Sequence, residues 1–83
     1  MHTAVVILNW NGKAWLERFL PTVLAHRGGA EVIVADNGST DDSVAWLRAN
    51  QPIVRTIALP TNLGFAGGYN AALAQVEADR YLL

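Results

Sequence analysis

The sequence predicts an α/β protein of three layers, α/β/α, in which helices cover both faces of a mostly parallel sheet. Segments with strand and helix periodicity alternate along its 83 residues in the order β-α-β-α-β-α-β. Residues 32–35 (VIVA) form a β-branched apolar run without polar alternation, which is typical of a strand buried on both faces. This order of elements implies right-handed crossovers between parallel strands.

The first strand is expected at residues 3–9, because residues 5–8 (VVIL) are all apolar. The polar segment 9–12 (NWNG) ends it. A helix follows over residues 13–25, and Pro21 within it predicts a kink or a restart. The helical spacing of apolar residues is carried by Trp15, Leu16, Phe19, Leu20, Val23 and Leu24.

The second half of the chain repeats the alternation of strands and helices. We expect strands at residues 31–36, 53–59 and 81–83, with the alternating 53–59 segment at a sheet edge. Helices are expected at residues 41–50 and from Gly64 or Phe65 to about Val76. Ser39 or Thr40 would cap the helix at 41–50, which buries Val44, Trp46 or Leu47. The strand at 81–83 is only beginning, so we expect a truncated sheet.

Composition and charge argue against several classes of protein. Apolar residues make up 52% of the chain, the net charge is −1 and the six basic residues are scattered, which argues against nucleic-acid binding. There is no cysteine, and therefore no disulfide framework or thiolate metal site. The first residues lack the charged start of a signal peptide, and residues 5–8 are too few to span a bilayer. We therefore expect a soluble, cytoplasmic protein.

The most informative residue is Asp36, which follows the buried run 32–35 directly. In open α/β sheets, ligands bind at the carboxyl ends of the strands. A carboxylate there costs stability unless donors satisfy it, and ribose hydroxyls or a pyrimidine ring N–H are suitable donors. Asn37 and Gly38 form the turn, while Asp41 and Asp42 suit the start of the next helix and are interpreted as structural. An Asx turn or a helix cap is the alternative role of Asp36.

The loop after the first strand offers Asn9 and Asn11, whose amide groups can contact a base edge or a sugar. Asn11 could instead cap the first helix. The segment lacks the glycine pattern of dinucleotide-binding folds and the lysine motif of P-loop proteins, so NAD, FAD and P-loop chemistry are disfavoured.

Residues 62–70 (NLGFAGGYN) form the third candidate segment. Its glycines are poor helix formers, at about 1 kcal/mol each relative to alanine, so a close approach of ligand or sheet must favour them. The ligand candidates here are Asn62, Gly64, Gly68 and Asn70. Tight packing of the helix on the sheet is the alternative for one of the glycines.

The remaining residues suggest no catalytic group. Trp15 and Trp46 lie at helical spacing and are expected in the core, whereas Trp10 lies in a loop on the ligand side. His2 and His26 are far apart in the sequence and suggest neither a metal site nor a base. Ser39 has no evident histidine partner for nucleophilic catalysis.

The segments 5–12 (VVILNWNG), 32–41 (VIVADNGSTD) and 62–70, in this order, resemble the start of the family 2 glycosyltransferases. The residues of the first and third segments are most similar to those of the rhamnosyltransferase-type branch. The resemblance spans nearly the whole chain. It implies the Rossmann-like GT-A fold, with residues 1–83 as one incomplete subdomain that binds a nucleotide sugar. A dTDP-, UDP- or GDP-sugar would be the donor for inverting transfer to a hydroxyl. By resemblance, Asp36, Asn37 and the first loop would hold base and ribose.

The resemblance also implies Mg²⁺ or Mn²⁺ in the full-length enzyme, held by an Asp-x-Asp-like motif directly after the fourth strand. This chain stops before that motif and before any general base, and Asp79 precedes the strand. We therefore expect no metal on this chain and no turnover. The full-length protein could associate peripherally with a membrane.

Two other classes stay open. One is a stand-alone nucleotide-binding or self-associating module, which would pair through residues 81–83 or the third helix, because open sheet edges invite pairing. The other is a nucleotidyltransferase, which would need a glycine-rich loop and a basic residue after the first strand, where only Lys13 is near.

Overall fold

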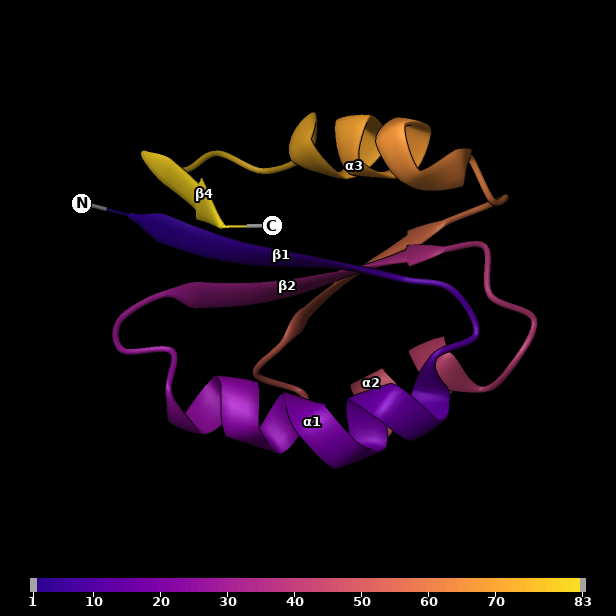
Figure 1. Cartoon of the computed structure of the whole chain (residues 1–83), viewed down its shortest axis with the longest axis horizontal. Helices are drawn as coiled ribbons and strands as arrows, with labels where there is room; N and C mark the ends of the chain where they lie inside the picture. The colour runs from indigo at the N-terminus through magenta and orange to yellow at the C-terminus, as the bar shows by residue number, and fades with distance from the viewer. Residues whose placement is uncertain (1, 83) are drawn as a thin grey trace.

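The computed structural model describes residues 2–82. Strands and helices alternate as expected, and the helices cover both faces of the sheet (Figure 1). The elements are β1 (Thr3–Asn9), α1 (Lys13–Ala25), β2 (Glu31–Asn37), α2 (Ser43–Asn50), β3 (Arg55–Leu59), α3 (Gly64–Leu73) and β4 (Arg80–Leu82). Leu83, expected in the last strand, lies outside the described residues.

The four strands are parallel and lie in the order β3-β2-β1-β4. α3 packs on one face, and α1 and α2 pack on the other (Figure 1). The three-layer α/β/α prediction and the edge position of β3 are therefore confirmed. Because all strands point the same way, the loops after β1, β2 and β3 meet at the carboxyl ends of the strands, where Asn9 is paired with Asp36.

The sheet has a separate apolar core on each face. Six of the seven residues of β2 are buried, and the four apolar ones alternate between the two cores. Val32 and Val34 pack with α1 and α2, whereas Ile33 and Ala35 pack on the α3 side. Burial on both faces explains why this strand shows no polar alternation.

α1 is one continuous helix through Pro21, so the expected restart is wrong. Pro21 is exposed, so the carbonyl that loses its amide partner can bond to water instead. Trp15 is 47% exposed, which corrects its assignment to the core; the side of α1 that faces the sheet carries Leu16 and Leu20. Trp46 is half-buried against the same core, as expected.

Three boundaries differ from the expected ones by at least two residues. α2 begins at Ser43 rather than at residue 41, and β3 begins at Arg55 because residues 51–54 form a turn closed by a hydrogen bond from Val54 N to Gln51 O. α3 ends at Leu73, where bonds between residues three apart replace the α-helical pattern. Within the described part of the chain, no helix is long and apolar enough to cross a membrane.

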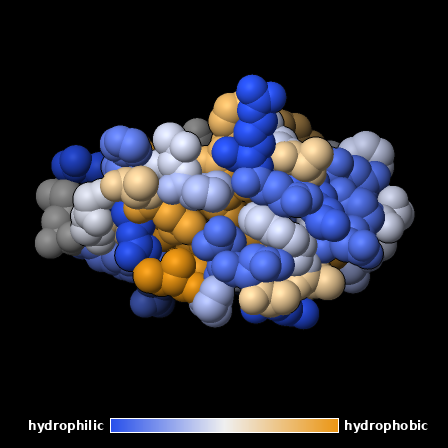
Figure 2. Space-filling view, turned by 90° about the horizontal axis from the view of Figure 1, so that it is seen from below, coloured by the Kyte–Doolittle hydropathy of each residue, from blue (hydrophilic) through white to orange (hydrophobic). Residues whose placement is uncertain are grey.

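The face that carries α1 and α2 has an apolar strip exposed between polar residues (Figure 2). A hollow of about 490 Å³ opens beside α1, near the amino ends of the strands. It is lined by Thr3, Val5, Val23, His26, Arg27, Gly29, Ala30 and Leu82.

Gly68 provides a test of how closely α3 packs on the sheet. A β-carbon there would lie 2.9 Å from both Asn37 Nδ2 and Leu8 Cδ1. We expect Gly68→Ala to lower the free energy of unfolding by about 1 kcal/mol or more in urea titrations, because overpacking outweighs the gain in helix propensity.

Gly67→Ala is the matched control, since its β-carbon would meet only Leu63 Cβ, at 3.2 Å, on an exposed residue. It should be neutral or stabilising. A Gly68→Ala protein as stable as the wild type would contradict the packing geometry.

Candidate functional site

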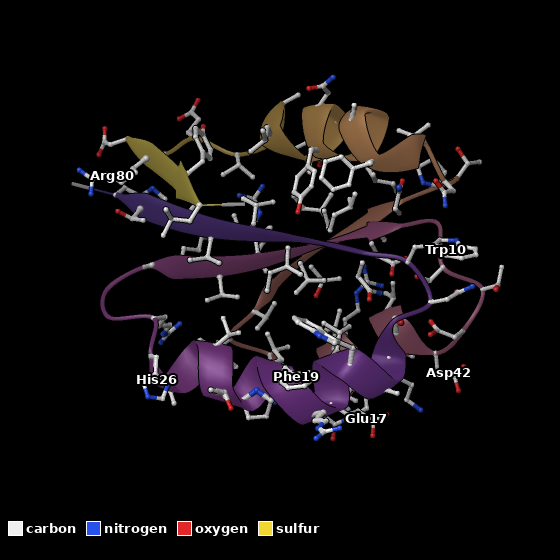
Figure 3. All side chains as sticks on the ribbon, in the orientation of Figure 1. Trp10, Glu17, Phe19, His26, Asp42 and Arg80 are labelled. Atoms are coloured by element: carbon white, nitrogen blue, oxygen red, sulfur yellow. The ribbon has the colours of Figure 1, made fainter. Side chains whose placement is uncertain are left out.

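The candidate site lies at the carboxyl ends of the strands, where hydrogen bonds from side chains connect the loops that follow β1, β2 and β3. Figure 3 shows Trp10 and Asp42 near this edge, with Arg80 at the opposite one. In the structure, most of the polar side chains that the sequence analysis singled out form hydrogen bonds within or between these loops.

Asp36 is 2% exposed, and its carboxylate accepts three hydrogen bonds from the protein. Oδ1 accepts from Asn9 Nδ2 at 2.9 Å and from Ser39 Oγ at 2.6 Å, and Oδ2 accepts from the Ser39 amide at 2.9 Å. The donors expected from a nucleoside are therefore supplied here by the neighbouring loops. The carboxylate bonds to the amide of Ser39, three residues on, rather than to the amide two residues on as in an Asx turn.

Asn11 joins the first loop to the second. Its side-chain oxygen Oδ1 accepts from the main-chain amides of Thr40 at 2.7 Å and Asp41 at 3.2 Å. Its main-chain amide donates to Ser39 Oγ at 2.9 Å. Asn11 has a φ of 51°, and Gly12 holds the capping position of α1 without a side-chain bond. Asn11 therefore does not cap the first helix.

Asp41 connects the starts of two helices. Its Oδ2 accepts from the amide of Lys13, the first residue of α1, at 3.3 Å, and its Oδ1 accepts from the amide and hydroxyl of Ser43. Ser39 and Thr40 bond to Asp36 and Asn11, so their expected role as helix caps is wrong. The structural interpretation of Asp41 is confirmed, although it precedes α2 rather than lying in its first turn.

Asn37 holds the third loop and is 3% exposed. Its Oδ1 accepts from the Leu63 amide at 2.9 Å, and its Nδ2 donates to Asn62 Oδ1 at 3.2 Å and to Gly64 O at 3.0 Å. Asn62 Oδ1 also accepts from the Gly64 amide at 2.7 Å. Together these bonds fix the chain just before α3.

Gly64 and Gly68 of α3 are glycines for different structural reasons. Gly64 has a φ of +76°, a conformation that residues with a β-carbon rarely adopt. Gly68 is buried against Asn37 and Leu8, as the packing alternative required. Asn70 is exposed on the outer part of the helix.

A second hollow, of about 380 Å³, lies at the end of β1 beside the start of α1. Trp10 and Trp15, 54% and 47% exposed, belong to its lining, and Trp15 also packs on Phe19 with ring centroids 5.4 Å apart. The full lining is Ile7, Leu8, Asn9, Trp10, Gly12 and Trp15. Sequence reasoning missed Trp15 as a lining residue, although its position one turn after the NWNG loop was a usable signal.

Metal-binding chemistry has no support in the described part of the chain, residues 2–82, where no three His, Cys, Asp or Glu side chains group together. Asp79 accepts from the His2 amide at 2.7 Å, at the amino end of the strands and away from the candidate site.

Comparisons with known proteins agree with this architecture. The structure is similar to the mannosyltransferase PcManGT from Pyrobaculum calidifontis, solved in complex with GDP-Man and Mn²⁺, with a TM-score of 0.79 and 22% identity over 93% of this chain and 25% of that one. It is also similar to S. aureus TarS, with a TM-score of 0.78 and 23% identity over 100% of this chain and 16% of that one. The fold is thus the Rossmann-like GT-A fold.

The model of the family described as "Glycosyl transferase family 2" matches residues 4–83, and the chain therefore belongs to this family. It is 36% identical over 73 residues to N-acetylglucosaminyl-diphospho-decaprenol L-rhamnosyltransferase of Mycobacterium tuberculosis, covering 87% of this chain and 24% of the relative. An uncharacterised glycosyltransferase of Nostoc sp. is 32% identical over 83 residues, at 95% and 26% coverage. The chain spans about a quarter of the length of these relatives.

Asp41 makes the stability of the site depend on pH. The hydrogen bond from the Ser43 hydroxyl, with smaller help from the Ser43 and Lys13 amides, lowers the pKa of Asp41 below its ordinary 3.8, and partial desolvation opposes this. A lowered pKa in the folded state adds stability above the unfolded pKa, and that stability is lost as the pH falls through the folded pKa.

We therefore expect urea titrations between about pH 4 and pH 2 to show a smaller loss of stability for Asp41→Asn than for the wild type. The control is Asp42→Asn, because Asp42 makes no side-chain capping bond at α2. Identical pH profiles for the wild type and Asp41→Asn would contradict the role of this carboxylate.

Proposed function

We propose that this chain is the donor-binding part of a family 2 glycosyltransferase and holds the nucleotide of a dTDP-, UDP- or GDP-sugar for inverting transfer to a hydroxyl. The observation that carries the proposal is the joining of three loops, by side-chain hydrogen bonds, at the carboxyl edge of a sheet whose sequence matches the family over residues 4–83. Ligands of open α/β folds bind at this edge.

The candidate residues divide into two groups by exposure. Asn9, Asp36, Asn37 and Gly68 are buried and support the loops. Asn11, Asn62, Gly64 and Asn70 are exposed, so their surfaces can meet a ligand without rearrangement of the sheet.

The divalent metal that the family resemblance implies does not fit the described residues of this chain, which offer no suitable cluster of ligands. The PcManGT structure holds Mn²⁺ together with GDP-Man. For this protein we propose that Mg²⁺ or Mn²⁺ would be held by groups other than the described residues 2–82.

The proposal predicts binding without turnover. Isothermal titration calorimetry should detect at least one of UDP, dTDP and GDP, whereas incubation with the corresponding nucleotide sugars and Mn²⁺ should release no free nucleoside diphosphate. Absence of heat for all three nucleotides would contradict donor binding, and sugar transfer by the chain alone would contradict the assignment of the catalytic groups to another part of the protein.

The exposed strand β4 favours a second candidate, a self-associating module. All three of its residues are exposed, including Tyr81 at 39% and Leu82 at 51%, and it forms an edge of the sheet. Exposed apolar edge strands pair readily with other strands.

Sedimentation velocity over a range of concentrations should therefore show association of the wild type that is lost in Leu82→Lys, because a charge at an edge opposes strand pairing. Ile53→Lys, which alters another exposed apolar residue, should behave like the wild type. A monomeric wild type at high concentration would remove this candidate.

A further inference from the structure

Two asparagines of the chain are each followed by glycine, Asn11 by Gly12 and Asn37 by Gly38. In such a pair the main-chain nitrogen of the glycine can attack the carboxamide carbon of the asparagine, because no side chain on the glycine stands in its way. The chemistry is the same in both pairs. Any difference in their reactivity must therefore come from the surrounding structure.

The first pair is accessible to water, and its attacking nitrogen is free. Asn11 is exposed, and within the described part of the chain the main-chain amide of Gly12 donates no hydrogen bond. Asn11 has a φ of 51°, which is uncommon for a residue with a β-carbon. Turning the Gly12 amide toward the Asn11 side chain therefore breaks no hydrogen bond of that amide.

The carboxamide of Asn11 is polarised for attack. Its Oδ1 accepts from the main-chain amides of Thr40 at 2.7 Å and Asp41 at 3.2 Å. Two N–H donors on one oxygen stabilise the negative charge that develops there when the carbonyl carbon is attacked. The same donors fix which end of the carboxamide is the oxygen, since an NH₂ group could not accept from them.

The leaving group also has a suitable neighbour. Nδ2 of Asn11, which must depart as ammonia, lies 3.2 Å from Thr40 Oγ1. A hydroxyl both accepts and donates, so it can give a proton to this nitrogen as the carbon–nitrogen bond breaks. Thr40 is exposed, and water can replace the proton that its hydroxyl gives up.

The second pair lacks these features. Asn37 is 3% exposed, and its Nδ2 donates to Asn62 Oδ1 and Gly64 O, which are acceptors with no proton to give. A β-carbon on Gly38 would lie 2.5 Å from the main-chain carbonyl carbon of Thr61. The turn at Gly38 therefore has no space in which to rearrange.

We propose that Asn11 is a site of spontaneous deamidation, whereas Asn37 is protected by the fold. The Gly12 nitrogen forms a bond to Asn11 Cγ and gives its proton to solvent. The bond from Cγ to Nδ2 breaks, and ammonia leaves with a proton from the Thr40 hydroxyl. The succinimide ring then takes up one water molecule at either of its carbonyl carbons, which leaves aspartate or isoaspartate at position 11. No nucleotide takes part, so the inference does not depend on the proposed function.

The isoaspartate product would weaken the connection between the first two loops. In it the main chain runs through the former side-chain carbonyl, the group that accepts the Thr40 and Asp41 amides. The chain is longer by one carbon immediately before α1, so these bonds and the position of the helix cannot both be kept. We therefore expect converted chains to have a lower free energy of unfolding in urea titrations.

The test follows both asparagines by peptide mapping and mass spectrometry while the whole chain is incubated at mildly alkaline pH. In the folded chain Asn11 should convert at least about tenfold faster than Asn37, because burial and hydrogen bonding at Asn37 oppose the local opening that ring closure needs. In urea sufficient to unfold the chain the two rates should become similar. Methylation by an isoaspartyl methyltransferase identifies the isoaspartate product.

Thr40→Val tests the hydroxyl, because valine keeps the shape of the side chain and the main-chain amide stays in place. It should slow conversion at Asn11 and leave conversion at Asn37 unchanged. Thr40→Ser is the matched control, which retains a hydroxyl and should convert Asn11 at the rate of the wild type. A Thr40→Val chain that failed to fold would be recognised by similar rates at the two sites, as in urea, and the wild-type comparison would still decide the proposal.

Equal rates at Asn11 and Asn37 in the folded wild type, or faster conversion of Asn37, would overturn the proposal. An unchanged rate at Asn11 in a folded Thr40→Val protein would overturn the part assigned to the hydroxyl. Failure of the chain to bind any nucleotide would refute the proposed function and leave these rates as they are.

Discussion

Two adjacent residues at the end of the central strand β2 position all three loops of the candidate site. Consecutive residues of a strand point to opposite faces, so Asp36 follows Val32 and Val34 toward the α1 side, whereas Asn37 follows Ile33 and Ala35 toward α3. Asp36 then binds Asn9, the last residue of β1, from which the first loop continues, and Asn37 binds the third loop through the Leu63 amide and Gly64 carbonyl. Because β2 lies between β1 and β3, one dipeptide reaches both neighbours.

This arrangement is stable because its polar groups are satisfied. No buried side-chain nitrogen or oxygen among residues 2–82 lacks a partner. Each such group would cost about 1–3 kcal/mol if its partner were removed. The loops have no strand or helix of their own at these positions, so the side-chain bonds replace the backbone ladder that orders the rest of the sheet. The residues that order the loops at the carboxyl ends of the strands therefore include ones that the family resemblance connects with the nucleotide, Asp36 and Asn37.

The sequence was sufficient for the fold because the strands and helices carry strong periodic patterns. It was weaker where side chains compete with the backbone. The start of α2 was placed two residues early, since the bonds of Asp41 to Lys13 and Ser43 link segments that only the folded chain brings together. Trp15 was assigned to the core because helical spacing groups it with Leu16, whereas in the structure it packs on Phe19 at the margin of the hollow.

The site shows a more general limit of sequence reasoning. A carboxylate at the end of a buried strand must find hydrogen-bond donors, and the sequence predicted that a nucleoside would supply them. The sequence could not distinguish a ligand from Asn9 and Ser39, because hydrogen-bond donors from either source satisfy the carboxylate equally. The residues of the first and second loops that supply these donors are about 30 positions apart in the sequence, and only the parallel pairing of β1 with β2 brings them into contact.

The position of the hollow decides which binding quantity is informative. β4 pairs with β1 only at residues 3–5, so among the described residues no strand lies beside Ile7 and Leu8 on that side. A longer relative that continued the same parallel register would place further chain there and close the hollow from one side. The absolute affinity of this chain for a nucleotide would then differ from that of such a relative, in which the further chain can add contacts. The difference in affinity between two nucleotides, both measured on this same chain, is therefore more informative than either affinity alone.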